Sequence, residues 1–379
     1  MSLEEIRNEI DSIDTELATL FKKRMECAKK VAEIKKKENK IVLNQSRERE
    51  ILNRVAGITG EELQSQTKVL YSTIFDLSRS YQTQHMADKS ELETNIKKAI
   101  ENTPNTFPKK AVVACQGVEG AYSQIVCDKL FSLPSIMYFN NFEGVFSAVE
   151  KGLCDYGILP IENSSYGSVN KVYDLMKKHK FYIAKSIKYR VNHSLLVKPN
   201  CDVSQIKEIF SHEQAIGQSS EFLKQFPLAK ITICENTALA AKTVAESDRT
   251  DVAALSSKDC AALYGLKVTK ENVQDNDNNY TRFICISKEL EIYPGADKIS
   301  LMLTASHKPG ALYELIAKFS ALGLNLTKLE SRPIPGTDFE FMFYFDMNAS
   351  VYDEQVIKLL SSLSEESGHF TYLGSYTEA

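Results

Sequence analysis

The first 90 residues contain no proline and only two glycines, Gly57 and Gly60, a composition that favours helices. Apolar residues recur in this segment mostly at intervals of three and four: Ile6, Ile10, Ile13, Leu17, Leu20, Ala28, Val31 and Ile34. The spacing predicts one long amphipathic helix, followed by a second helix over residues 46–55 and a third over residues 61–86. Because so small a helical unit cannot bury the stripe of its longest helix, we expect it to pair with a second copy.

The pattern changes twice beyond this all-α segment of residues 1–90. Residues 91–108 end in NTPNTFP, which is typical of a linker. In residues 109–289, β-rich runs such as AVVAC, YGILPI and RFICIS alternate with helical stretches, which predicts an α/β domain with a largely parallel sheet. After a break at IYPGAD, residues 297–379 follow the order βαββαβ of a ferredoxin-like α+β domain.

Composition excludes several classes of protein. The net charge of −4 argues against a general nucleic-acid binder, which would be basic. No stretch approaches the roughly 18 apolar residues of a membrane span. The start, MSLEEIRNEIDSIDTEL, is acidic and periodic, unlike a signal peptide, so we expect a cytoplasmic protein. The eight cysteines are scattered and the six histidines show no HExxH spacing, so we expect free thiols and no metal site.

Two cations interrupt the apolar stripe of the first helix. Arg24 and Lys35 are eleven residues apart, which places them on nearly the same helix face and about 16 Å apart along the axis. Cations that point into a helical core are costly unless an anion lies there, which suggests an anionic ligand. The alternative is that their long stems carry the charges to the surface.

The segment resembles the all-helical chorismate mutases over nearly its whole length. The resemblance rests on IRNEIDSID, Arg24, Lys35, the SRERE run, Ser78 and Gln82. It implies that the substrate carboxylates are bound by Arg7, Arg24 and Arg47. It further implies that Lys35 and Gln82 donate to the ether oxygen and that Glu48 contacts the ring hydroxyl. Ser78 and Gln82 are four residues apart and share one helix face, as this role requires.

Arg7 adds a geometric constraint. It lies about 25 Å from Arg24 along a straight helix, too far for both to hold one small substrate within a single chain. We therefore expect Arg7 to reach the pocket of the other subunit of an intertwined dimer. Where many relatives carry Asp near the ring hydroxyl, this chain has Asn44, whose amide can still donate or accept a hydrogen bond.

The middle segment offers two anion-binding features. AVVACQGVEGAYS predicts a strand, a glycine-containing turn over Gly117–Ser123 and a helix start, which presents backbone N–H groups to an anion. ILPIENSSYGSV predicts a strand that ends in Asn163, Ser164 and Ser165, and α/β sheets bind ligands at such strand ends. An ordinary strand-to-helix turn and a helix N-cap explain the two patterns equally well.

Together with HSLLV, SHEQAIGQ and NYTRFICIS, these motifs resemble prephenate dehydratase across about 180 residues. The family has a two-lobed fold of the periplasmic-binding-protein kind and uses no cofactor. The resemblance implies that Thr281 lies nearest the departing hydroxyl and that Arg282 and the Gly117–Ser123 turn help to hold carboxylates. It also implies a pocket lined by Asn163, Ser164, Ser165, Ser211 and Gln218.

The last segment resembles the amino-acid-binding ACT domains attached to these dehydratases, on the strength of PGALYELIAKFSALGLNLTKLESRP. The resemblance implies a phenylalanine site made by Gly310, Ala311, Leu312, Glu330, Ser331, Arg332 and Pro333. The alternative is a ferredoxin-like domain used only for dimerisation.

Taken in order, the three resemblances predict a member of the bifunctional chorismate mutase/prephenate dehydratase family. Such an enzyme converts chorismate to prephenate and then to phenylpyruvate, under inhibition by L-phenylalanine. We expect a homodimer or homotetramer, with no nucleic-acid or membrane partner. Two alternatives remain open: a middle domain that is an arogenate dehydratase, and a non-catalytic phenylalanine sensor or solute-binding protein.

Overall fold

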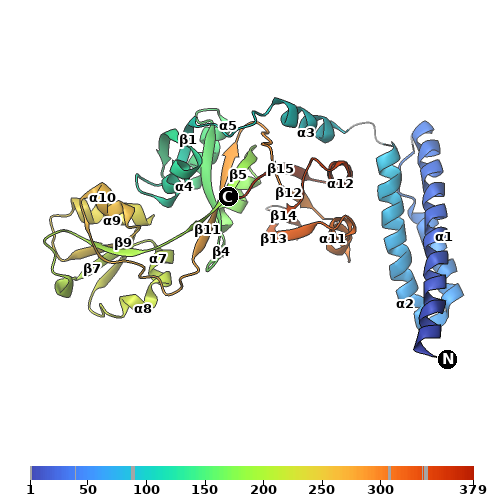
Figure 1. Cartoon of the computed structure of the whole chain (residues 1–379), viewed down its shortest axis with the longest axis horizontal. Coiled ribbons are helices and arrows are strands. Elements are labelled where there is room, and N and C mark those ends of the chain that lie inside the picture. Colours follow the sequence, from blue (N-terminus) through green and yellow to red (C-terminus); the bar gives the residue numbers. More distant parts are fainter. Residues whose placement is uncertain (1, 39, 87–89, 306–308, 335, 337–339) are drawn as a thin grey trace. The chain divides into compact units, whose positions relative to one another are not determined.

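A computed structural model describes residues 2–38, 40–86, 90–305, 309–334, 336 and 340–379 (Figure 1). The chain forms two compact units, which are described separately. The first comprises residues 1–95, 305–324 and 352–369, and the second comprises residues 96–304, 325–351 and 370–379. Among the described residues, no helix is both long enough and apolar enough to cross a membrane.

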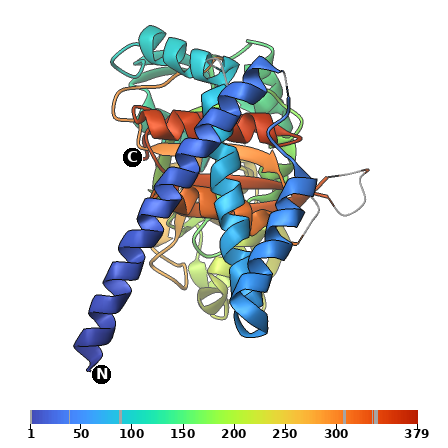
Figure 2. The ribbon, with the colours of Figure 1, turned by 90° about the vertical axis from the view of Figure 1, so that its right-hand side faces the viewer.

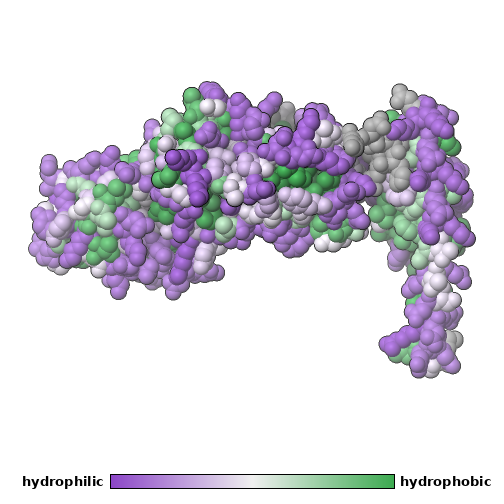
Figure 3. Space-filling view, turned by 45° about the horizontal axis from the view of Figure 1, so that its top comes forward, coloured by the Kyte–Doolittle hydropathy of each residue, from purple (hydrophilic) through white to green (hydrophobic). Residues whose placement is uncertain are grey.

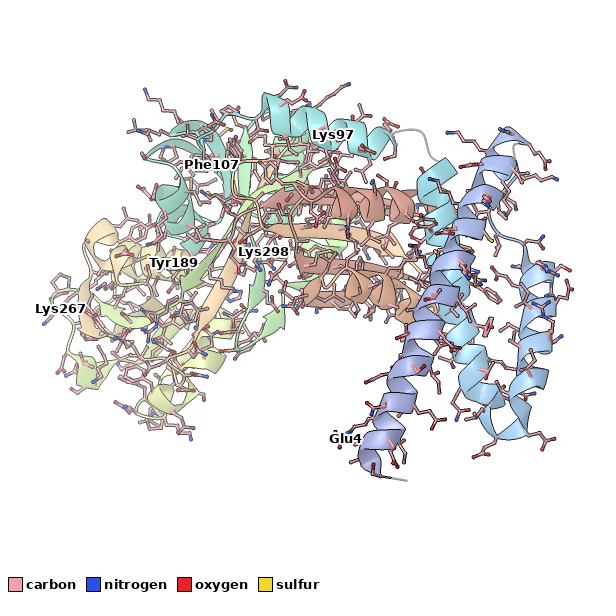
Figure 4. The ribbon with its side chains drawn as sticks, turned by 45° about the vertical axis from the view of Figure 1, so that its right-hand side comes forward. Glu4, Lys97, Phe107, Tyr189, Lys267 and Lys298 are labelled. Atoms are coloured by element: carbon pink, nitrogen blue, oxygen red, sulfur yellow. The ribbon has the colours of Figure 1, made fainter. Side chains whose placement is uncertain are left out.

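The first unit is helical. Its elements are α1 (Leu3–Lys37), α2 (Gln45–Met86), α11 (Ala311–Ala321) and α12 (Glu354–Glu366). Ser2 and Glu5 form a reciprocal capping box that fixes the start of α1, near Glu4 in Figure 4. Gly60 breaks α2 at a φ of 72°, where a side chain would be strained, so α2 consists of two arms that lie beside α1 (Figure 2). These arms correspond to the second and third helices expected from the sequence.

The apolar stripe of α1 is largely exposed along its first two thirds, as the sequence predicts for a helix that needs a second copy. Ile10, Leu17 and Leu20 keep 49%, 55% and 60% of their surface exposed. Further along the helix, Ala28 and Ala32 are buried. Figure 3 shows apolar residues at the surface of this helical segment.

Between the helices and the first strand, residues 91–102 of the expected linker form a helix, α3 (Glu91–Asn102). The second unit then begins with a sheet of order β2-β1-β3-β11-β5, with β4 paired to β3. Its strands are β1 (Lys110–Gln116), β2 (Leu133–Phe139), β3 (Tyr156–Asn163), β4 (Gly167–Ser168), β5 (Tyr182–Arg190) and β11 (Tyr280–Ser287). Helices α4 (Tyr122–Leu130), α5 (Phe142–Glu150) and α6 (Asn170–Met176) connect them.

A second lobe is inserted between β5 and β11, which are neighbours in the first sheet. Its sheet order is β10-β6-β9-β7-β8, with β6 (Ser194–Val197), β7 (Glu208–Ser211), β8 (Lys230–Ile233), β9 (Val252–Ser256) and β10 (Lys267–Lys270). The helical turns are η1 (Val203–Gln205), α7 (Glu213–Gln218), α8 (Ser220–Leu223), α9 (Thr237–Glu246) and α10 (Asp259–Tyr264). The chain therefore crosses between the lobes twice, on β5–β6 and β10–β11.

The sheets are mixed rather than largely parallel. β1 pairs in parallel with β2 and β3, but β11 is antiparallel to both β3 and β5. The physical reason is the inserted lobe, since β5 leaves the first sheet and β11 re-enters beside it in the opposite direction. This return places the start of β11 at the cleft between the lobes.

A third sheet has the order β13-β14-β12-β15, and all of its pairs are antiparallel. Its strands are β12 (Lys298–Thr304), β13 (Asn325–Pro333), β14 (Phe341–Asn348) and β15 (Phe370–Tyr376), so the element order is βαββαβ as expected. β12 begins at Lys298, which Figure 4 labels together with Tyr189 of β5. Beyond β15 the chain bridges to β5 through Ser186 and Glu378. A Cβ on Gly374 would lie 2.5 Å from the carbonyl oxygen of Ile183, so β15 approaches β5 closely at this point.

Candidate active sites

A cavity of about 490 Å³ lies between the two lobes of the second unit. The first lobe contributes Gln116, Tyr122, Ser123, Asn163, Lys171 and Thr281, and the second lobe contributes His193, His212, Gln214, Gln218, Asn236 and Thr237. The first residues of α4 and α9 line the cavity, so two helix N-termini, which carry free backbone N–H groups in general, form part of its wall. Among the described lining residues, Lys171 is the one Lys or Arg. Glu235 is the one Asp or Glu among these described lining residues, so the wall combines one cation and one carboxylate with neutral polar groups and is suited to a small polar ligand.

Asn163 and Thr281 face each other across the antiparallel pair of β3 and β11. The Asn163 side-chain oxygen accepts hydrogen bonds from the backbone N–H groups of Ser165 and Tyr166, at 2.9 and 3.0 Å. Its NH₂ group is thereby turned towards Thr281, to whose Oγ1 it donates at 2.9 Å. Because Thr281 Oγ1 accepts this bond, the hydroxyl proton remains available for donation to a molecule in the cavity.

Two residues that the sequence did not single out complete this network. Asn279, which is 1% exposed, accepts from Asn163 at 2.9 Å and donates to Gln218 at 3.1 Å. His193 Nε2 lies 2.8 Å from the side-chain oxygen of Gln218, which can only accept, so His193 donates through Nε2. Burial lowers the pKa of His193, which favours this neutral tautomer. The sequence features that could have identified them are the polar run before YTRF, which contains Asn279, and the motif HSLLV, which begins with His193.

The three predicted serines form local hydrogen bonds and are outside the cavity lining. Ser164 Oγ donates to the carbonyl of Asn278 at 2.8 Å and so fastens the end of β3 to the approach to β11. Ser165 contributes its backbone N–H to Asn163. Ser211, fully buried, donates to the carbonyl of Leu255 at 2.8 Å within the second lobe.

Arg282 lies on the face of β11 away from the cavity. Its guanidinium pairs with Asp346 and lies 2.8 Å from Glu378. The reason is the two-residue period of a strand, which directs Thr281 and Arg282 to opposite faces. At the cavity itself, Lys171 is the cationic side chain among the described lining residues, and the starts of α4 and α9 form part of the wall.

The Gly117–Ser123 turn does reach the cavity through Ser123, whose Oγ donates to the carbonyl of Gln116 at 2.7 Å. Gly120 adopts a φ of 86°, and a Cβ there would lie 2.8 Å from Cys260 Sγ. This turn therefore needs glycine to approach the second lobe so closely.

In the first unit, the structure brings Glu48 into electrostatic range of both Arg24 and Lys35. Burial lowers the pKa of Arg24 and of Lys35, and the Glu48 carboxylate partly opposes both shifts. Gln82 is 7% exposed and donates to the hydroxyl of Ser78 at 3.2 Å. Among the described residues, Arg24 Nη1 and Gln82 Oε1 are buried without a hydrogen-bond partner. Buried polar atoms normally have a hydrogen-bond partner, so these two atoms are free to bind a polar ligand.

Arg79, which the sequence did not single out, pairs with Glu48 at 2.5 Å. Asn44 caps α2, since its side-chain oxygen accepts from the backbone N–H of Arg47 at 3.0 Å. The guanidinium of Arg47 pairs with Glu50 at 2.7 Å in an exposed position. Arg7 is also exposed, well along α1 from the other cations.

The remaining predicted residues belong to the C-terminal segments. Gly310 is the N-cap of α11 at a φ of 84°, followed by Ala311 and Leu312 in the first turn. Glu330, Ser331, Arg332 and Pro333 end β13. All eight cysteines are free, and among the described residues no group of three or more His, Cys, Asp or Glu side chains is arranged to hold a metal ion.

Known proteins give the two sites their context. The sequence model of the prephenate dehydratase family matches residues 113–291, and that of chorismate mutase type II matches residues 6–83. A bifunctional chorismate mutase/prephenate dehydratase of Aquifex aeolicus (strain VF5) is 31% identical over 381 residues, covering 100% of this chain and 98% of the relative. The chain belongs to the bifunctional chorismate mutase/prephenate dehydratase family. It therefore carries both enzymatic domains of phenylalanine biosynthesis, as the sequence predicted.

Two further relatives are each similar to 70% of this chain. Arogenate dehydratase/prephenate dehydratase 1 of Arabidopsis thaliana is 36% identical over 284 residues, covering 70% of this chain and 72% of the relative. The solved structure of prephenate dehydratase from Arthrobacter aurescens in complex with L-Phe is 28% identical with a TM-score of 0.65. It covers 70% of this chain and 89% of that one. The likeness confirms the two-lobed, periplasmic-binding-protein-like fold of the dehydratase domain.

Proposed function

We propose that Thr281 is the group that assists departure of the prephenate hydroxyl and that Asn163 orients it. The hydrogen bond from the Asn163 amide to Thr281 Oγ1, which leaves the hydroxyl proton free at the cavity, carries this proposal. In the reaction the ring C–O bond breaks, and the hydroxyl leaves with the electron pair of that bond and takes up one proton from solvent to become water. The ring carboxylate leaves as carbon dioxide, and the electron pair of the broken C–C bond completes the aromatic ring. Because a Thr hydroxyl is a weak acid, Thr281 contributes a hydrogen bond to the departing oxygen rather than a full proton transfer.

The two substrate carboxylates are bound by the parts of the cavity wall that carry a cation or free backbone N–H groups. Lys171 and the first turns of α4 and α9 line it. Helix N-termini bind anions through free backbone N–H groups and the helix dipole. The neutral His193–Gln218–Asn279 chain of hydrogen bonds holds the Asn163 amide in place.

In the helical unit, we propose that Arg24 binds a chorismate carboxylate and that Lys35 and Gln82 donate to the ether oxygen. A Claisen rearrangement needs no nucleophile, only a folded substrate and donors aimed at the oxygen that gains charge. The buried and unpartnered Arg24 Nη1 supports a site built around an anion. Glu48, Arg47, Asn44 and Ser78 complete it, and Arg7 belongs to the pocket of a second subunit whose α1 covers the exposed apolar stripe.

We propose that the C-terminal segments form an ACT domain that binds L-phenylalanine, and that Gly310–Leu312 and Glu330–Pro333 are the residues that serve this role. The solved relative in complex with L-Phe supports this ligand. Binding favours a less active arrangement to the extent that phenylalanine has different affinities for the two states.

One competing substrate has a specific observation in its favour. The Arabidopsis relative, named for arogenate as well as prephenate, is 36% identical over 70% of this chain, whereas the Aquifex protein is 31% identical over all of it. The test is to supply each compound to the purified protein and to measure phenylpyruvate and phenylalanine. Phenylpyruvate from prephenate at a kcat/KM above that for arogenate supports the proposal, and the reverse preference refutes it.

A further inference from the structure

The two strands that carry the dehydratase groups present a second row of side chains on their other face. In the antiparallel register, Thr281 lies opposite Asn163 and Arg282 lies opposite Glu162. Since successive side chains of a strand alternate between faces, Arg282 and Glu162 lie directly behind the cavity pair. Neither is used by the reaction described above.

Arg282 is held by two strands of the C-terminal sheet and by the residues that follow it. It is 6% exposed and pairs with Asp346 of β14, which is fully buried. It also donates to the hydroxyl of Tyr376 of β15 at 2.8 Å and lies 2.8 Å from Glu378. Ser300 of β12 donates to Asp346 as well. A buried guanidinium with this many oriented partners has one favoured position, and loss of a partner leaves an uncompensated charge.

Glu162 is held by a third strand of the same sheet. Lys328 of β13 lies 2.7 Å from the Glu162 carboxylate and donates to Ser168 Oγ at 2.8 Å. Ser168 in turn donates to Glu330 at 2.6 Å. Two residues after Glu330 on β13, Arg332 donates two hydrogen bonds to the Asp174 carboxylate of α6, at 2.9 and 3.1 Å.

β13 therefore has two distinct faces. Lys328, Glu330 and Arg332 are partly buried and point at the dehydratase lobe, whereas the alternate residues of the strand are exposed. Ser331 and Pro333 lie on the exposed face. A displacement of β13 or β14 would act on Glu162 and Arg282, each adjacent in the chain to a cavity residue.

We propose that Arg282 and Glu162 are positioning residues through which the C-terminal sheet sets the geometry of Thr281 and Asn163, and thereby transmits the phenylalanine signal. The transmission of the phenylalanine signal rests on the regulation proposed above, whereas the positioning role does not. The coupling element is a contiguous set of ion pairs from β13 and β14 to the backs of β3 and β11.

Two matched pairs of variants test this inference. R282K keeps the charge but removes the planar fork, and its control R249K alters an arginine that pairs with Glu208 and Asp251 in the second lobe. K328M removes the cation opposite Glu162, and its control K230M removes the cation opposite Glu208. Each full-length protein is assayed for mutase kcat, dehydratase kcat and KM, the phenylalanine concentration for half-inhibition, and phenylalanine binding by calorimetry.

R282K is expected to lower dehydratase kcat by about tenfold or more with KM changed by less than about threefold, because a misplaced catalytic group costs turnover. K328M is expected to raise the half-inhibiting phenylalanine concentration by about fivefold or more, the lower end of typical allosteric coupling, while phenylalanine still binds. Both controls should match the wild type, and mutase kcat should be unchanged throughout. If R282K fails to fold, the half-inhibiting phenylalanine concentration of K328M decides whether the C-terminal sheet is coupled to the dehydratase site.

The outcomes separate the two proposals. If the wild type is inhibited by phenylalanine and both test variants behave like their controls, the coupling inference is overturned and the regulation stands. If the wild type neither binds phenylalanine nor is inhibited by it, the regulation falls. The positioning role is then decided by the dehydratase kcat of R282K, and wild-type turnover in that variant would overturn it.

Discussion

Replacement of Asn163 by Asp is an isosteric change that tests how Thr281 is oriented. The aspartate keeps the oxygen that accepts the backbone N–H groups of Ser165 and Tyr166, so the turn after β3 should persist. It removes the NH₂ donor to Thr281 Oγ1, which lies 2.9 Å away. A carboxylate in that place accepts the Thr281 proton instead, and Thr281 can then no longer donate to the departing hydroxyl.

The size of the effect follows from that lost hydrogen bond. Removal of one donor to an oxygen that gains charge in the transition state costs about 10²–10³-fold in kcat, or about 2.7–4 kcal/mol. We therefore expect N163D to reduce dehydratase kcat by about two to three orders of magnitude. The new negative charge should also raise KM for the anionic substrate.

The assay follows phenylpyruvate formation from prephenate, with chorismate consumption by the same sample as the measure of intact protein. Asn140 lines the same cavity, so N140D adds an equal charge without removing the Thr281 donor, and it should change KM more than kcat. A dehydratase kcat of N163D within about threefold of the wild type would refute the orienting role of Asn163.

Three further results are expected. K35M should lower mutase kcat by about 10²-fold or more and spare the dehydratase, because it removes the donor to the ether oxygen; equal loss of both activities would indicate a folding defect instead. The depressed pKa of His193, caused by burial, means that the unfolded chain binds its proton first as the pH falls, so this group's contribution to stability is present above about pH 6.5 and declines below it. H193N, whose amide can donate to Gln218, should flatten that acid limb in denaturant titrations, and an unchanged limb would assign it to another group. L17K, on the exposed stripe of α1, should shift the protein towards a smaller assembly in light scattering and lower mutase kcat, whereas an unchanged mass would argue against pairing through α1.

The sequence predicted the helical unit and the order of the strands well, because both depend on local periodicity. The break in α2 falls at Gly60, one of two glycines in the first 90 residues, and the apolar stripe of α1 is exposed as its length implied. What the sequence could not supply was the mixed direction of the sheets. That direction depends on an inserted lobe and on the return of β11 beside β5, which no local pattern encodes.

For the dehydratase residues too, some positions could be predicted from the sequence and others depend on the tertiary fold. Asn163, Thr281 and Gln218 were found from motifs, and the structure gathers them around the cavity. Arg282 follows Thr281 in the same motif, and the family resemblance implied that it helps to hold carboxylates. The two-residue period of the strand places it behind the sheet, where only the tertiary fold reveals Asp346 and Glu378.

In the mutase unit, the sequence could not predict ion pairs between residues that are far apart in the chain. Arg24 and Lys35 could be placed on one helix face from their spacing alone. The partner of Glu48 is Arg79, 31 residues away and on the far arm of α2, so its role depends on how the arms fold back. Nothing in the SRSYQ segment around Arg79 indicates this contact.

The most direct test of the account supplies chorismate to the purified wild-type chain and to T281A, and follows chorismate, prephenate and phenylpyruvate together. The account predicts that the wild type consumes chorismate and releases phenylpyruvate. It predicts that T281A consumes chorismate at the same rate but accumulates prephenate. Phenylpyruvate formation by T281A at the wild-type rate would contradict the assignment of the dehydratase site, and failure of the wild type to consume chorismate would contradict that of the mutase site.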